Sequence, residues 1–266
     1  MHMAVFIKQV PDTTEVKINP ETGTLIRAGV PSIINPYDHF ALHSALELKK
    51  KHGFRVTVIS MGPPQAKSVV QFALALGADD GVLLSDMALA GSDTWATSYA
   101  LSRAAKKAGK LDLILCGMQA IDGDTAQVGP GVAQQLGIAQ VTNCLHVDLD
   151  GKKFIVKKLI DNGYEMVEVR PPALFTMIMP PDYASIYPSF PDIHAALAKP
   201  YQVWSAADIG AEERYLGLKG SPTQVNKIYP PPLKGKAQMT HGSAHQAVEK
   251  LLEIMKKEHF ISDVSA

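Results

Sequence analysis

The feature of this sequence that most constrains its fold is a fourfold alternation of short apolar runs with amphipathic stretches between Ala4 and Gly137. Each apolar run has the length and composition of a strand buried on both faces, and each stretch after it repeats apolar residues at helical spacing. The predicted strands are 4–10, 55–60, 82–85 and 113–115, and the predicted helices run from a cap at Asn35 or Asp38 to Gly53, then over 65–76, 94–108 and 130–136. This alternation predicts a doubly wound parallel α/β sheet.

The loops that follow parallel strands meet at one edge of the sheet, where open α/β sheets bind ligands. The predicted loops at this edge contain Lys8-Gln9 and residues 60–62, 86–94 and 117–125. We therefore expect these four segments, which are far apart in the sequence, to line one crevice.

The loop from Gly117 to Thr125 has the most readable chemistry. Because no Lys or Arg occurs in 111–151, a phosphate here would depend on backbone amides, the N-terminus of the following helix, and hydroxyl or amide side chains. Asp122 and Asp124 would repel a phosphate, and we assign them to ribose hydroxyls, amide capping or nicotinamide-side contacts. An ordinary turn with a helix cap explains this Asp-Gly-Asp run equally well.

A second polar cluster lies at the start of the predicted helix 94–108. Gly91 and Asp93 precede this helix, and Thr94, Thr97 and Ser98 place hydroxyl groups in its first turns. These hydroxyls suit a phosphate or pyrophosphate, whereas helix capping alone would explain only Asp93 or Thr94.

Charge and cysteine content exclude several classes of protein. The 26 acidic and 26 basic residues balance, which argues against nucleic acid or a membrane surface as the main partner. Cys116 and Cys144 are the only cysteines, and we read both as reduced thiols in a cytoplasmic protein with no metal site. His39 and His43 are spaced for one helix face, and we expect a surface role for both. With no signal peptide and no apolar run of membrane-spanning length, membrane insertion is not expected.

The pattern changes after Val141, and a hairpin is also expected earlier, over 15–26. Residues 146–156 and 164–169 read as antiparallel strands with tight turns at Asp150-Gly151 and Asn162-Gly163, and 173–178 reads as a further strand. From Trp204 to Gly235 the chain looks extended, either disordered or draped over a partner. A final amphipathic helix, 244–257, is expected to dock on another subunit. We therefore divide the chain into a nucleotide-binding domain, 1–199, and a C-terminal arm with its helix, 200–266.

Several segments together resemble the β (small) subunit of electron-transfer flavoproteins over most of the chain. They are VFIKQVPDT (5–13), INPYDHFAL (34–42), VISMGPPQA (58–66), ALGADDGVLLSD (75–86), CGMQAIDGDTAQVGP (116–130) and GSPTQV (220–225). The resemblance implies an adenine-nucleotide-binding, Rossmann-like domain and a C-terminal arm that wraps an α subunit to form a heterodimer.

The resemblance also implies which residues contact the nucleotide, which is FAD in the electron-bifurcating branch and structural AMP in the other branch. These residues are Phe6, Ile7, Lys8, Asn35, Pro36, Tyr37, Asp38, Ser60, Met61, Gly62, Gly117, Met118, Gln119, Ala120, Ile121, Asp122, Gly123, Asp124, Thr125, Ala126, Gln127 and Val128. Segments 35–38 (NPYD), 91–98 and 120–130 resemble the bifurcating branch. In that branch, electrons from NADH are divided between a low-potential, ferredoxin-like acceptor and a flavin dehydrogenase.

One segment departs from the family. Members usually carry a basic, arginine-containing loop that recognises the dehydrogenase, but residues 177–199 contain no arginine. A lactate-type dehydrogenase therefore fits at least as well as an acyl-CoA dehydrogenase. Two rival functions are a stand-alone nucleotide-binding stress-type protein, which the long arm disfavours, and an ATP-dependent enzyme of the same fold group, which would need a basic phosphate loop.

Overall fold

The computed structural model describes residues 1–12, 31–226, 239 and 242–261. The chain forms two compact units, Met1–Asn226 and Lys227–Ala266. The first is built on a nine-stranded sheet in the order β11-β5-β4-β1-β6-β10-β7-β8-β9, beside a small ladder of β2 and β3. The strands are β1 His2–Phe6, β2 Gln9–Pro11, β3 Ser32–Ile34, β4 Arg55–Met61, β5 Asp80–Leu84, β6 Leu113–Gly117, β7 Ala139–Asp150, β8 Lys153–Ile160, β9 Gly163–Val169, β10 Ala173–Met177 and β11 Gln202–Trp204. The predicted α/β fold is confirmed.

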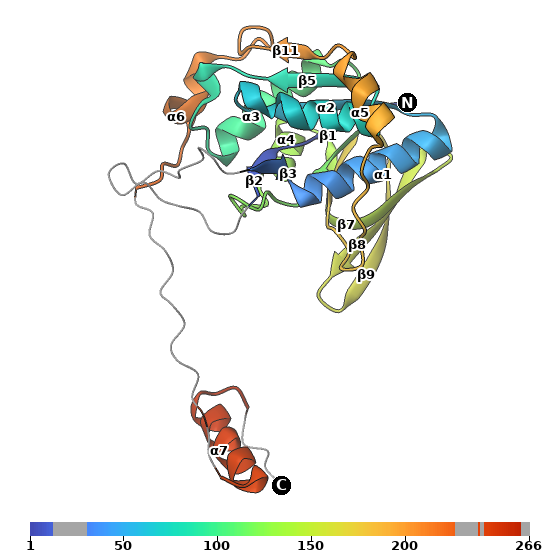
Figure 1. The fold of residues 1–266 in the computed structure, drawn as a ribbon. Helices are drawn as coiled ribbons and strands as arrows, with labels where there is room; N and C mark the ends of the chain where they lie inside the picture. Colours follow the sequence, from blue (N-terminus) through green and yellow to red (C-terminus); the bar gives the residue numbers. More distant parts are fainter. Residues whose placement is uncertain (13–30, 227–238, 240–241, 262–266) are drawn as a thin grey trace. The chain divides into compact units, whose positions relative to one another are not determined.

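Helices cover both faces of the parallel part of the sheet (Figure 1). These are α1 Pro36–His52, α2 Lys67–Leu76, α3 Thr94–Lys107 and α4 Val128–Leu136. Met3 and Val5 of β1 pack with α1 and α2, whereas Ala4 and Phe6 pack with α3 and α4. This twofold alternation within one fully apolar strand divides the core into two layers, because successive side chains point to opposite faces.

The direction in which successive strands are added to the sheet changes next to β1. From β1 the chain builds outward through β4 and β5 on one side, and then crosses to β6 on the other side. Ligands bind open α/β sheets beyond the carboxyl ends of strands at such a point. The ends of β1 and β6, at Phe6 and Gly117, therefore define the region where a site is expected.

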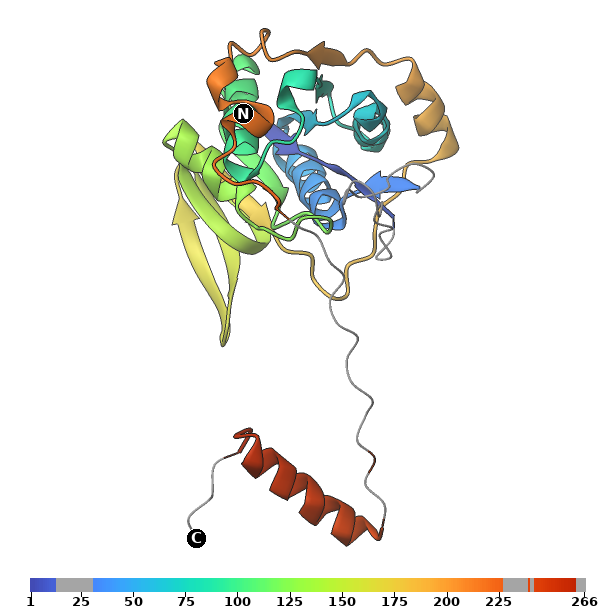
Figure 2. The ribbon, with the colours of Figure 1, turned by 90° about the vertical axis from the view of Figure 1, so that its left-hand side faces the viewer.

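An antiparallel extension follows α4. Strand β7 pairs parallel with β10 and antiparallel with β8, and β9 completes the extension as its edge. Figure 2 shows β8 and β9 continuing as a ribbon away from the helix-covered sheet. The predicted turns at Asp150-Gly151 and Asn162-Gly163 join these strands. Helix α5, Phe190–Leu197, was not expected from the sequence and packs on α2.

The segment after β11 corrects one expectation. Trp204, Ile209 and Leu216 are buried in the core beside α3, and Thr223 is bonded to Asp93, so residues 204–223 pack on this chain instead of being extended. Elements η3 Glu213–Tyr215 and α6 Gly217–Gly220 lie in this segment, η2 Met87–Leu89 precedes α3 and contacts α6, and η1 Pro64–Ala66 precedes α2. Residues 227–235 and the hairpin expected over 15–26 lie outside the described residues. In the second unit, α7 spans Ala244–Lys257 as predicted.

Candidate functional site

A buried carboxylate joins the ends of the two strands at the switch point. Asp38 lies in the first turn of α1 and accepts hydrogen bonds from the backbone N–H of Lys8 (2.8 Å) and of Gly117 (2.8 Å). Burial raises the pKa of Asp38 to about 7, and the hydrogen bonds from Gly117, Asn35 and Lys8 oppose that rise. Asp38 therefore joins the ends of β1 and β6 instead of capping α1.

Asn35 ties the same floor to the loop after β6. It precedes α1 but makes no side-chain cap. Instead its Nδ2 donates to the carbonyl of Gln119 (2.8 Å), and its Oδ1 accepts from the N–H of Ile121 (3.2 Å). Because Asn35 is completely buried, these bonds set the path by which the loop leaves the sheet.

The tip of this loop is exposed and strained. Residues 123–127 are all exposed, and Asp124 (φ 48°) and Ala126 (φ 54°) have left-handed backbones. A left-handed backbone at an alanine costs about 1–2 kcal/mol of conformational energy. Such strain clusters at ligand-binding positions. Ala126 is followed by Gln127 at φ −103° and ψ −23°, an alternation of handedness that turns successive N–H groups toward one point, as in anion-binding nests.

The backbone donors of the loop tip are free to meet a ligand. Within the described part of the chain, the N–H groups of Thr125, Ala126 and Gln127 have no hydrogen-bond acceptor. They lie immediately before α4, whose N-terminus adds a partial positive charge. This arrangement suits a phosphate held by the main chain.

One basic side chain enters the loop from a distant part of the sequence. Lys8 Nζ binds both carboxylate oxygens of Asp122, at 2.7 and 2.9 Å. The side chain of Asp122 is 12% exposed and that of Lys8 is 46% exposed. The absence of Lys and Arg from 111–151 concealed this pair, because Lys8 follows β1. Asp122 is thus neutralised within the site and need not repel an anion.

Two glycines of the region are required by packing. A Cβ on Gly117 would lie 2.5 Å from Asp38 Oδ1 and 2.6 Å from Tyr37 Cβ, and a Cβ on Gly129 would lie 2.6 Å from Thr176 Cγ2. Gly123, by contrast, faces open space. The loop is therefore held rigidly at its base and is open in its middle.

The remaining predicted contacts lie at the end of β4 and at the start of α3. Ser60 is fully buried at the end of β4, and its Oγ has no partner among the described residues. Met61 and Gly62 follow it and are half-buried. Thr94 Oγ1 donates to Gln127 Oε1 at 2.9 Å, so the start of α3 does meet the 117–128 loop. Gly91 and Asp93 instead contact residues 217–223, a connection that sequence reasoning missed.

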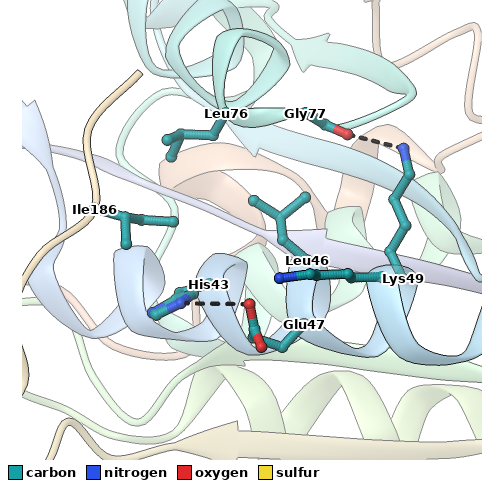
Figure 3. Close-up of a pocket in the computed structure, with 8 residues that line it drawn as sticks. His43, Leu46, Glu47, Lys49, Leu76, Gly77 and Ile186 are labelled. Atoms are coloured by element: carbon teal, nitrogen blue, oxygen red, sulfur yellow. Dashed lines mark hydrogen bonds and ion pairs between the residues drawn. The ribbon is translucent and has the colours of Figure 1, made fainter. Parts of the chain in front are cut away.

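The two histidines expected at the surface, His39 and His43, differ in burial. His39 is buried, 4% exposed, with its ring edge-on to Phe72 and Tyr187. His43 lies in a shallow groove between α1, the end of α2 and Ile186, where its Nε2 is 3.9 Å from Glu47 (Figure 3). This groove contains none of the predicted nucleotide contacts. Within the described residues, no helix has both the length and the apolar character to cross a bilayer.

Comparison with known proteins identifies the family. Residues 22–209 match the electron transfer flavoprotein domain. The chain is 48% identical to electron transfer flavoprotein subunit beta of Clostridium acetobutylicum, over 98% of this chain and all of that protein. It is 45% identical to caffeyl-CoA reductase-Etf complex subunit CarD of Acetobacterium woodii, over 98% of this chain and all of that protein. It is 42% identical to acryloyl-CoA reductase electron transfer subunit gamma of Anaerotignum propionicum, again over 98% and 100%. The chain therefore belongs to the electron transfer flavoprotein family, as a β subunit.

Proposed function

We propose that this β subunit forms a heterodimer with an electron transfer flavoprotein α subunit, binds FAD in the crevice of the 117–128 loop, and serves flavin-based electron bifurcation. In this role the complex accepts electrons from NADH and delivers them to a low-potential, ferredoxin-like acceptor and to a flavin dehydrogenase. FAD supplies the hydride and single-electron chemistry when bound. The residues of this chain bind, orient and shield it.

The observation that carries the proposal is the row of N–H groups at Thr125, Ala126 and Gln127, just before α4, for which the described residues offer no acceptor. The diphosphate of a dinucleotide is the ligand that such a row and a helix N-terminus suit best. The exposed middle of the loop leaves room for the ligand to approach the backbone. The hydroxyl of Thr94, which donates to Gln127, adds a polar group from α3 beside the loop.

Two observations support the bifurcating role: the bond between the start of α3 and the 117–128 loop, and the names of two relatives. Two of the segments that resemble the bifurcating branch, 91–98 and 120–130, meet through the Thr94–Gln127 bond. Two similar proteins are named as parts of caffeyl-CoA reductase and acryloyl-CoA reductase systems. The alternative is a non-bifurcating β subunit in which structural AMP occupies this site in place of FAD.

Two apolar surfaces support the proposed partners. Helix α7 exposes Val248, Leu251 and Leu252 along one side, as expected of a helix that docks on an α subunit. In the first unit, Tyr187, Phe190 and Leu197 are exposed on and beside α5. We propose that this second surface contacts the dehydrogenase, of acyl-CoA or lactate type, by apolar contacts in place of the missing arginines.

Cofactor analysis of the purified heterodimer tests the proposal. We expect two FAD and no AMP per heterodimer, one FAD in this site and the other in the α subunit. When a flavin dehydrogenase and its oxidised substrate are added to take the remaining electrons, we expect ferredoxin reduction that depends on NADH. One FAD plus AMP, with no NADH oxidation, would rule out bifurcation.

A matched pair of variants tests the location of the nucleotide. Lys8→Met breaks the pair with Asp122 and leaves that carboxylate unneutralised beside the loop, so nucleotide affinity falls about tenfold if the phosphates lie there. Lys153→Met breaks the Lys153–Glu168 pair, whose lysine is equally exposed at 45% but lies on β8. Each loss costs less than about 1 kcal/mol of stability. Equal nucleotide affinities of the two variants would place the ligand elsewhere.

A further inference from the structure

The carboxylate of Asp93 holds two segments that are 130 residues apart in the sequence. Its Oδ1 accepts the N–H of Ala96 at 3.0 Å and so caps α3. Its Oδ2 accepts both the N–H (2.9 Å) and the Oγ1–H (2.8 Å) of Thr223. One side chain therefore acts as a helix cap and as the anchor of a second segment.

The anchored segment, 217–223, is held at several further points, and we call it the clamp segment. The N–H of Asp93 donates to Ser221 Oγ at 2.8 Å, and that hydroxyl donates to the carbonyl of Gly217 at 2.7 Å. The N–H of Leu218 donates to the carbonyl of Ala90 at 3.1 Å. Gly217 has φ +59°, and a Cβ there would lie 2.5 Å from the carbonyl oxygen of Ala88. These contacts thus hold the clamp segment in one position against the loop before α3.

The first turns of α3 also contact the 117–128 loop. Thr94 Oγ1 donates to Gln127 Oε1 at 2.9 Å, and Ser98 Oγ lies 3.2 Å from the carbonyl of Val128. The space beside Ser98 is filled by α4, because a Cβ on Gly131 would lie 2.4 Å from its Oγ. The same end of α3 is therefore bonded to the loop on one side and to the clamp segment on the other.

We propose that Asp93 is a positioning residue that couples occupancy of the 117–128 loop to closure of the clamp segment, from which the chain continues toward its C-terminal helix. This inference rests on the proposed nucleotide site. A nucleotide that orders the loop also holds Gln127 against Thr94, which keeps the N-terminus of α3 and the Asp93 cap in place. By linkage, the factor by which nucleotide suppresses clamp opening equals the factor by which clamp closure strengthens nucleotide binding.

Asp93→Asn separates the two roles of the side chain. Asn caps helices as well as Asp does, so the bond from Ala96 is retained. The Nδ2 amide cannot accept from the N–H of Thr223, so that bond is lost, and the bond to the Thr223 hydroxyl persists only with Nδ2 as the donor and no longer involves a charged group. Thr223→Val removes only the hydroxyl bond, and Thr223→Ser retains it and serves as the conservative control.

Hydrogen exchange of the full-length chain, followed by mass spectrometry with and without AMP or FAD, tests the coupling. We expect Asp93→Asn to speed exchange of the clamp segment about tenfold, as loss of hydrogen bonds to a charged group implies, while exchange within α3 is unchanged. Thr223→Val should have a smaller effect, and Thr223→Ser none. Nucleotide should slow clamp exchange in the wild type, and Asp93→Asn should weaken nucleotide affinity about fivefold.

The outcomes separate this inference from the proposed function. A nucleotide that binds the wild-type chain without slowing clamp exchange, or that binds Asp93→Asn equally well, overturns the coupling and leaves the nucleotide site standing. Clamp exchange that Asp93→Asn does not change overturns the anchoring role itself. Failure of both AMP and FAD to bind the wild type overturns the proposed function, and the coupling with it.

Discussion

Replacing Gly117 by alanine tests how the base of the crevice is built. Gly117 ends β6 and pairs with β10, which fixes its backbone within the sheet. An added Cβ would lie 2.5 Å from Asp38 Oδ1, 2.6 Å from Tyr37 Cβ and 2.8 Å from Asp38 N. All three atoms belong to residues at the start of α1, and Tyr37 Cβ and Asp38 N are fixed to its backbone, so relief requires moving the helix or the strand.

The magnitude follows from two contributions. Overpacking a closed site of this kind costs about 1–3 kcal/mol. Displacing the Asp38 carboxylate weakens the bond from the N–H of Gly117, now 2.8 Å, and a buried N–H left without its partner costs about 1–3 kcal/mol more. We therefore expect a loss of about 2–6 kcal/mol, which lowers Tm by roughly 4–24 °C for a unit of this size.

Thermal unfolding of the full-length chain, followed by circular dichroism, measures this loss. Gly123→Ala is the matched control, because Gly123 lies in the same loop and an added Cβ there meets nothing within 4 Å. The control should keep the wild-type Tm. Equal Tm values for Gly117→Ala and Gly123→Ala would refute the close approach of α1 to β6.

Three further predictions concern other groups. The raised pKa of Asp38, about 7, means that the folded chain keeps a proton which the unfolded chain releases above about pH 4, so this contribution to stability declines between about pH 4 and 7. Asp38→Asn should remove that decline, worth roughly 3 kcal/mol between pH 5 and pH 8, in urea unfolding at those two pH values. Ala126→Gly should relieve the left-handed strain and raise the free energy of unfolding by up to about 1 kcal/mol in the same assay. Burial raises the pKa of Cys116 and that of Cys144, the latter to about 12, so neither thiol should react with Ellman's reagent at pH 8 until the chain is unfolded.

The sequence predicted the sheet and its helices because each local pattern agrees with the tertiary role. Strands buried on both faces must be apolar throughout, and helices that cover a sheet must repeat at 3.6 residues. Gly53, Gly77 and Gly137 end helices in left-handed conformations, so those boundaries were also readable. The end of α7 at Lys257 followed from its apolar periodicity alone.

The features that escaped prediction depend on contacts between distant residues. The pair of Lys8 with Asp122 spans 114 positions, and that of Asp93 with Thr223 spans 130. Composition in a local window could reveal neither. The burial of Trp204 had the same cause, since β11 docks at the sheet edge beside β5. His39 was misplaced at the surface because its aromatic neighbours come partly from 183–187, a segment without regular periodicity.

The central claim is that the main chain of the 117–128 loop holds the phosphates of a nucleotide. A crystal structure of the purified heterodimer with its native nucleotide tests this most directly. We predict phosphate oxygens within hydrogen-bonding distance of the N–H groups of Thr125, Ala126 and Gln127, at the start of α4. Those N–H groups facing only solvent, with the phosphates bound elsewhere on the chain or by lysine side chains alone, would contradict the account.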